Sequence, residues 1–135
     1  MTLDTSSPEQ TERAGADLAG GLAPGDVVLV SGELGSGKTT FVRGACRELG
    51  VDGPVTSPTF TIGHVLGGEP EVAHVDLYRL GSLAAEDPAL LEDYLTAERI
   101  SFVEWPAAGE PVFERVAARV LLEHLGGDRR RITIA

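Results

Sequence analysis

The chain has 135 residues, of which 42% are hydrophobic and 24% charged, and its formal net charge is −10. This length suits one domain with a buried core, and the composition is that of an ordinary globular protein. No apolar run reaches the roughly 18 residues that a membrane-spanning helix needs. A chain this acidic has few positive side chains available to contact nucleic-acid phosphates. We therefore expect a single domain, residues 1–135, that meets a nucleic acid only through a partner.

The beginning of the chain and its cysteine content favour a cytoplasmic protein. The segment MTLDTSSPEQTERAG is polar and acidic, without the basic start and apolar stretch of a signal peptide. The single cysteine, Cys46, excludes an intramolecular disulfide and a multi-cysteine metal site. It lies in an apolar stripe at helical spacing, so we expect a packed core thiol.

The first predicted helix begins after Ser7. The segment SPEQ supplies an N-cap serine, a proline at the first helical position and the glutamine of a capping box. Two glycines end the helix at about Gly20. Its apolar face contains Thr11, Ala14, Leu18 and Leu22.

A buried strand and a glycine-rich loop follow. The continuous apolar run VVLVS, residues 27–31, is typical of a strand in a parallel sheet. The stretch GELGSGKTTF begins at Gly32, and a second amphipathic helix follows it and ends at Gly50.

The rest of the chain predicts two hairpins, a helix and another strand. TFTIGHVL and EVAHVDL are separated by GGEP, and ARVLLEHL and RRRITIA by GGD. Between these hairpins lie a helix-favouring region from Ser82 to about Thr96 and the strand RISFVEW. Since tight hairpins cannot belong to a wholly parallel sheet, we predict an α/β domain with a mixed parallel and antiparallel sheet.

The glycine-rich loop fits the pattern G-x-x-x-x-G-K-[ST]. Its glycines let successive N–H groups turn toward phosphate oxygens, and the positive end of the following helix dipole adds to them. Lys38, the only lysine in the chain, would reach the β- and γ-phosphates, and the hydroxyl of Thr39 would bind Mg²⁺. A buried strand before the loop and an amphipathic helix after it argue against an accidental match.

Two carboxylates could complete a magnesium site. Asp76 ends the strand EVAHV and Glu104 ends the strand ISFV. Either could instead be a solvated residue at a strand end. Together with the Thr39 hydroxyl, they would suit a hard cation that keeps several waters.

The sequence favours ATP over GTP as the bound nucleotide. Guanine-specific proteins of this class usually carry an N-K-x-D-like element, and the chain has no second lysine to supply it. A small-metabolite kinase is an alternative, although 135 residues leave little room for a lid and an acceptor pocket. Arg79 could act on a phosphate or pair with a neighbouring carboxylate, and the run Arg129–Arg131 could be a solvated strand end.

Four segments in order, GELGSGKTTFVRG, SPTFTI, HVDLYRL and FVEWP, resemble the bacterial TsaE family, which is a family of small ATPases needed to make threonylcarbamoyladenosine in tRNA. The resemblance implies a P-loop NTPase-like three-layer domain that binds ATP and Mg²⁺. It assigns the nucleotide to the loop residues Gly32, Glu33, Leu34, Gly35, Ser36, Gly37, Lys38, Thr39 and Thr40.

The same resemblance assigns roles outside the loop. Asp76 and Glu104 fall on an acidic pair that has both a catalytic and a metal-binding role. Lys38 shares the catalytic role, and Thr39 shares the metal-binding role. Thr59, in the segment SPTF, would act over the γ-phosphate. The base would be approached by Thr11 and by Arg130 or Arg131.

The resemblance also implies partners. Family members act with TsaD and TsaB, which would hold the tRNA while ATP hydrolysis resets the complex. A docking module that uses ATP only to order SPTF, with incidental hydrolysis, is an alternative to a partner-stimulated ATPase.

Overall fold

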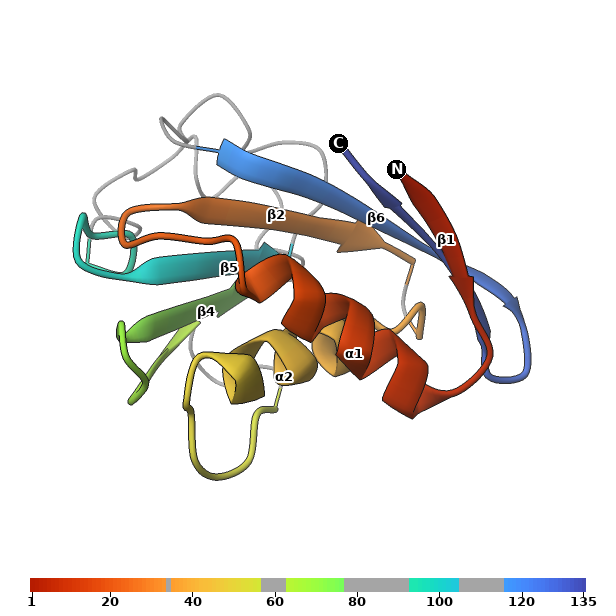
Figure 1. The fold of residues 1–135 in the computed structure, drawn as a ribbon, viewed down its shortest axis with the longest axis horizontal. Helices are drawn as coiled ribbons and strands as arrows, with labels where there is room; N and C mark the ends of the chain where they lie inside the picture. The colour runs from red at the N-terminus through yellow and green to blue at the C-terminus, as the bar shows by residue number, and fades with distance from the viewer. Residues whose placement is uncertain (34, 57–62, 77–92, 105–115) are drawn as a thin grey trace.

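The computed structural model describes residues 1–33, 35–56, 63–76, 93–104 and 116–135. Their strands form one sheet in the order β1-β7-β6-β2-β5-β4-β3 (Figure 1). The strand bounds are β1 Thr2–Thr5, β2 Val27–Gly32, β3 Gly63–Leu66, β4 Val72–Asp76, β5 Ile100–Glu104, β6 Val116–Gly126 and β7 Arg129–Ile134.

The sheet is mixed, as the sequence predicts. β2 pairs in parallel with β5 and β6, and β4 pairs in parallel with β5. The predicted hairpins are β3–β4 and β6–β7, both antiparallel. Because β2, β4 and β5 run the same way, their carboxyl ends meet at one edge of the sheet. The α/β fold with a mixed sheet is confirmed.

β1 is an addition to the predicted elements. Its segment is short and polar, so it has no hydrophobic alternation to identify it. It forms because β7 offers an edge, where Thr2 pairs with Thr133 and Thr5 with Arg130 in antiparallel register. This strand belongs to the sheet through a pairing of residues far apart in the chain.

Two helices are described, α1 over Pro8–Ala19 and α2 over Lys38–Glu48. Ser7 caps α1 as predicted, since its hydroxyl accepts a hydrogen bond of 3.2 Å from the backbone N–H of Gln10. In a capping box the side chain of Gln10 would accept from the backbone N–H of the N-cap, Ser7, but here it bonds one residue earlier. Its side-chain oxygen accepts from the backbone N–H of Ser6 at 2.8 Å.

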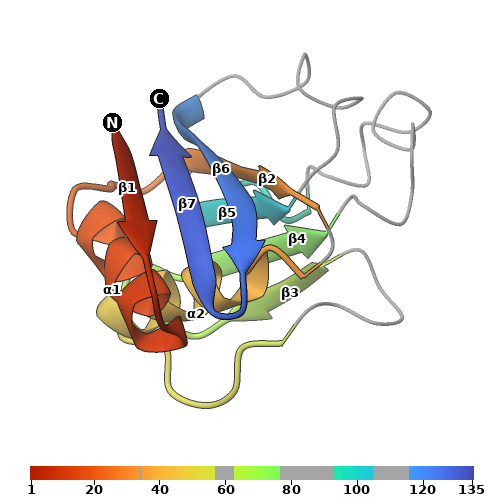
Figure 2. The same cartoon turned by 90° about the vertical axis from the view of Figure 1, so that its right-hand side faces the viewer.

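Both helices pack on the same face of the sheet (Figures 1 and 2). Phe41 and Ala45 of α2 share a buried cluster with Ala14 of α1 and with Val28 and Val30 of β2. The other face of the sheet has a smaller cluster that includes Leu29 and Val103.

The described residues thus account for two layers. Most of the helix predicted from Ser82 to Thr96 lies outside them, and Asp93 and Tyr94 form a turn. No helix in the described part of the chain is long and apolar enough to span a bilayer.

Cys46 lies in the main core, as predicted. It is fully buried on α2, and burial raises the pKa of its thiol to about 12. The thiolate is therefore strongly disfavoured, and the residue packs as a small hydrophobic group.

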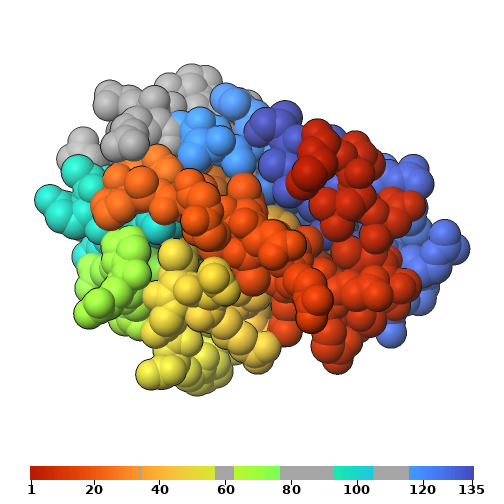
Figure 3. Space-filling model, viewed as in Figure 1, coloured from red at the N-terminus to blue at the C-terminus, as the bar shows by residue number. Residues whose placement is uncertain are grey.

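Glycines allow an unusually close approach of the two helices, which lie against each other on the face shown in Figure 3. A Cβ atom on Gly44 of α2 would lie 1.9 Å from the carbonyl oxygen of Glu12. A Cβ atom on Gly15 of α1 would lie 2.0 Å from the carbonyl oxygen of Phe41. No residue with a side chain fits at either position unless the helices separate.

We predict that Gly44→Ala destabilises the protein by about 1–3 kcal/mol, the usual cost of forcing extra atoms into a packed contact. Thermal unfolding monitored by circular dichroism measures the effect. Gly20→Ala is the matched control, because Gly20 has helical angles and its nearest neighbour to an added Cβ lies at 3.6 Å. Equal stability of the two variants would contradict the close contact.

Candidate nucleotide-binding site

The glycine-rich loop connects β2 to α2 at the carboxyl edge of the sheet. Gly35 and Gly37 have φ values of 80° and 99°, in the left-handed region that other residues rarely adopt. Gly37 is the N-cap of α2 and supplies no side-chain hydrogen bond to the first turn. The first turn of α2 therefore has no side-chain cap, and helix N-termini that follow such loops bind phosphates in other proteins. Leu34 lies outside the described residues.

Lys38 lies folded across this loop. Its Nζ donates hydrogen bonds to the carbonyl oxygens of Gly32 at 2.8 Å and Glu33 at 3.0 Å. Burial lowers the pKa of the Lys38 ammonium from its ordinary value, and the charges of Glu104 and Asp76 act in the opposite direction. The lysine, the loop and both predicted carboxylates thus occupy one neighbourhood.

The two carboxylates are adjacent in the sheet. Asp76 and Glu104 are register partners at the ends of β4 and β5. Glu104 is buried, with 2% of its surface exposed, whereas Asp76 is half-buried. The Thr39 hydroxyl donates to Glu104 Oε1 at 3.1 Å, which connects α2 to β5. The structure therefore brings together the three residues that the sequence suggests for a metal.

This donor set fits Mg²⁺. It consists of one hydroxyl and two carboxylates, all hard oxygen ligands. Within the described ranges, no cluster of three or more His, Cys, Asp or Glu side chains could hold a metal alone. A divalent cation here would therefore have to share its coordination with water and with phosphate oxygens, as Mg²⁺ does at nucleotide sites.

The sequence analysis missed His74, which also contacts this group. Its Nε2 lies 2.9 Å from Glu104 Oε2, and the imidazole has no exposed surface. The signal was present in the strand pattern. Because side chains alternate along a strand, His74 lies on the same face of β4 as Asp76.

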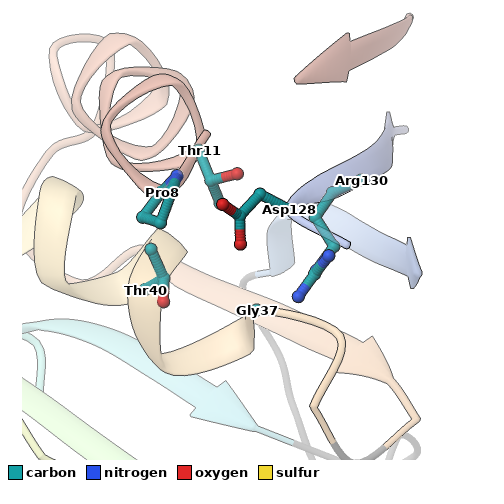
Figure 4. Close-up of a pocket in the computed structure, with 6 residues that line it drawn as sticks. All are labelled: Pro8, Thr11, Gly37, Thr40, Asp128 and Arg130. Carbon is teal, nitrogen blue, oxygen red and sulfur yellow. The ribbon is translucent and has the colours of Figure 1, made fainter. Parts of the chain in front are cut away.

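A small pocket opens beside the start of α2 (Figure 4). It is lined by Pro8, Thr11, Gly37, Thr40, Asp128 and Arg130. Pro8 and Asp128 were not expected from the sequence, because only the folded chain brings the start of α1 and the β6–β7 turn together.

Two residues proposed for base contact lie in this pocket. Thr11 is buried, and its hydroxyl shares a 2.7 Å hydrogen bond with the hydroxyl of Thr5. Arg130 donates to the carbonyl oxygens of Gly35 at 3.2 Å and Gly127 at 2.7 Å. The arginine thus connects the β6–β7 turn to the glycine-rich loop.

Arg131 lies elsewhere. It pairs with Asp4 of β1, with Nε to Oδ1 at 2.9 Å and Nη2 to Oδ2 at 3.2 Å. This hydrogen-bonded arginine lowers the pKa of the Asp4 carboxyl. Neighbouring residues on a strand face opposite sides, so only Arg130 of the two lines the pocket. Thr59 and Arg79 lie outside the described residues.

Comparison with known proteins identifies the family. Residues 5–132 match the family described as "Threonylcarbamoyl adenosine biosynthesis protein TsaE". A solved structure, the crystal structure of Bacillus subtilis YdiB, superposes with a TM-score of 0.77 at 31% identity and covers 99% of this chain and 83% of that chain.

Several curated relatives carry the name tRNA threonylcarbamoyladenosine biosynthesis protein TsaE. The relative from Streptomyces coelicolor is 48% identical over 67% of this chain and 64% of its own length. The relative from Bacillus subtilis is 35% identical over 96% of this chain and 81% of its own length. The relative from Treponema pallidum is 32% identical over the whole of both chains. The glycine-rich loop, the paired carboxylates and these matches agree, and the chain belongs to the TsaE family.

Proposed function

We propose that this protein is a Mg²⁺-dependent ATPase that supports threonylcarbamoyladenosine modification of tRNA. The observation that carries the proposal is the hydrogen bond between Thr39 and Glu104. It joins a residue just after the glycine-rich loop to a buried carboxylate on the neighbouring strand. The part of the proposal that concerns tRNA modification is supported by the names of the relatives. The part that concerns ATP is supported by the residues of the site.

The loop would bind the triphosphate of ATP. Backbone amides of residues 35–39 would donate to the phosphate oxygens, and Lys38 would exchange its loop carbonyls for the β- and γ-phosphates. Thr39, Glu104 and Asp76 would hold Mg²⁺, directly or through water. The ion, when bound, neutralises charge on the phosphate oxygens.

Hydrolysis would proceed by attack of water on the γ-phosphorus. A new P–O bond forms, the bond to the β–γ bridging oxygen breaks, and ADP and inorganic phosphate result. Lys38 and the loop amides would stabilise the charge that develops. Asp76, which is half-buried, would orient the attacking water, and the roles of Asp76 and Glu104 could be exchanged.

The acidic composition favours an indirect role toward tRNA. With a net charge of −10, the chain has little capacity to neutralise RNA phosphates. TsaD-like and TsaB-like partners would bind the tRNA and modify it, while ATP hydrolysis by this chain would reset their complex. Release of free phosphate distinguishes this proposal from a small-metabolite kinase, which would transfer the phosphate to an acceptor.

Lys38→Ala is expected to reduce ATP hydrolysis by about 10²–10³-fold, because it removes a charge that meets the transferring phosphate. Phosphate release with the partner proteins present measures the loss. Arg47→Ala is the matched control, since it removes a positive charge from the same helix at an exposed pair with Glu12. Comparable losses in both variants would show that Lys38 acts only through net charge.

Glu104→Gln is expected to retain nucleotide binding in EDTA and to lose hydrolysis. The amide preserves the volume of the buried side chain and an acceptor oxygen, but it removes the negative charge that a metal needs. Fluorescence of mant-ATP measures binding, and phosphate release measures hydrolysis. If this variant still supports full tRNA modification with the partners, the docking-module interpretation replaces the ATPase.

Arg130→Ala is expected to weaken binding of mant-ADP, because it removes a wall of the pocket and its link to Gly35. Arg131→Ala is the matched control, since it removes the same charge one residue away on the opposite face of β7. Titrations of both variants in EDTA measure the difference. Equal affinities would exclude the pocket as a nucleotide contact.

A further inference from the structure

His74 is a polar residue within a buried and largely apolar strand. Its neighbours along β4, Val72, Ala73 and Val75, are apolar and fully buried, and its register partners are Phe102 on β5 and His64 on β3. A buried imidazole in such surroundings is unfavourable unless it is hydrogen-bonded. The one hydrogen-bond partner that the described structure gives it is Glu104.

The proton positions on the ring follow from these contacts. Nε2 faces a carboxylate oxygen at 2.9 Å and therefore donates to it. Nδ1 is buried, and no hydrogen-bond partner for it exists in the described part of the chain. Among the described residues, a proton on Nδ1 would therefore find no acceptor. The ring thus acts as a single donor, aimed at Glu104.

With His74 as a donor, the two carboxylate oxygens of Glu104 have different hydrogen-bond partners. Oε2 accepts from His74, and Oε1 accepts from the Thr39 hydroxyl. The last torsion of a glutamate is soft, so a carboxylate held at one oxygen alone could rotate. Held at both, it keeps one plane, and Oε1 stays at the start of α2.

We propose that His74 is a positioning residue for the metal site, which fixes the Glu104 carboxylate in the orientation that Mg²⁺ binding requires. The inference rests on the proposed function, since it assumes that Glu104 holds the metal of a nucleotide complex. Outer-shell hydrogen bonds of this kind orient ligands in metal sites generally. Because the imidazole is fully buried and its Nε2 faces Glu104, His74 should affect metal affinity without affecting binding of the nucleotide alone.

Two amides of different reach test the proposal. In His74→Gln the amide nitrogen takes the place of Nε2 and can donate to Glu104. In His74→Asn the same group is too short to reach. Binding of Mn²⁺ to the ADP complex, followed by the electron paramagnetic resonance signal of the free ion, reports on the metal site. Titration of mant-ADP in EDTA reports on the nucleotide, and thermal unfolding reports on the fold.

We expect His74→Asn to weaken Mn²⁺ binding by about 10–100-fold, the usual effect of losing an outer-shell partner. His74→Gln should keep most of the affinity, and all variants should bind mant-ADP equally in EDTA. If His74→Asn is unfolded at the assay temperature, His74→Leu serves as the variant without a donor.

Equal Mn²⁺ affinity in wild type and the donor-free variant would overturn the proposal. An equal loss in the glutamine and donor-free variants would also overturn it, because it would reveal a packing role. If wild type itself fails to bind mant-ADP, the proposed function fails and the role of His74 fails with it. If nucleotide binding is normal but either of the two Mn²⁺ results above is found, the role of His74 is wrong and the proposed function still stands.

Discussion

The hydrogen bond between Thr39 and Glu104 holds the site together, and the sheet register makes it possible. Glu104 is the partner of Val30 on β2 and of Asp76 on β4. A shift of either pairing by one residue would turn a carboxylate to the other face of the sheet. Burial of apolar residues on both faces prevents such a shift, so hydrophobic packing places the polar groups.

Much of this architecture could be predicted from the sequence, because local signals agree with the tertiary structure. β2 and β5 are nearly continuous apolar runs, as strands buried on both faces must be. The loop between β2 and α2 has its glycines where the backbone needs positive φ. Once parallel strands are assumed, Asp76 and Glu104 must end at the same edge.

The remaining features depend on contacts between distant segments. β1 exists through its pairing with β7, and Asp128 reaches the pocket beside Pro8 because the β6–β7 turn lies against the start of α1. The choice between Arg130 and Arg131 depends on the register of β7, which a run of three arginines leaves undetermined. Strand alternation places His74 on the same face as Asp76, but it does not reveal the hydrogen bond to Glu104, which lies 30 residues away in the chain.

The folded position of Lys38 has a consequence for which ligands the loop selects. Its ammonium already donates to two backbone carbonyls, so a ligand must offer better acceptors before the lysine leaves them. A polyphosphate offers charged oxygens, which form hydrogen bonds roughly twice as strong as neutral ones. A nucleoside or a monophosphate would offer fewer charged oxygens to the same ammonium. If the loop binds phosphates as proposed, it would favour longer phosphate chains, because the ligand must compete with the carbonyl oxygens of Gly32 and Glu33 for the Lys38 ammonium.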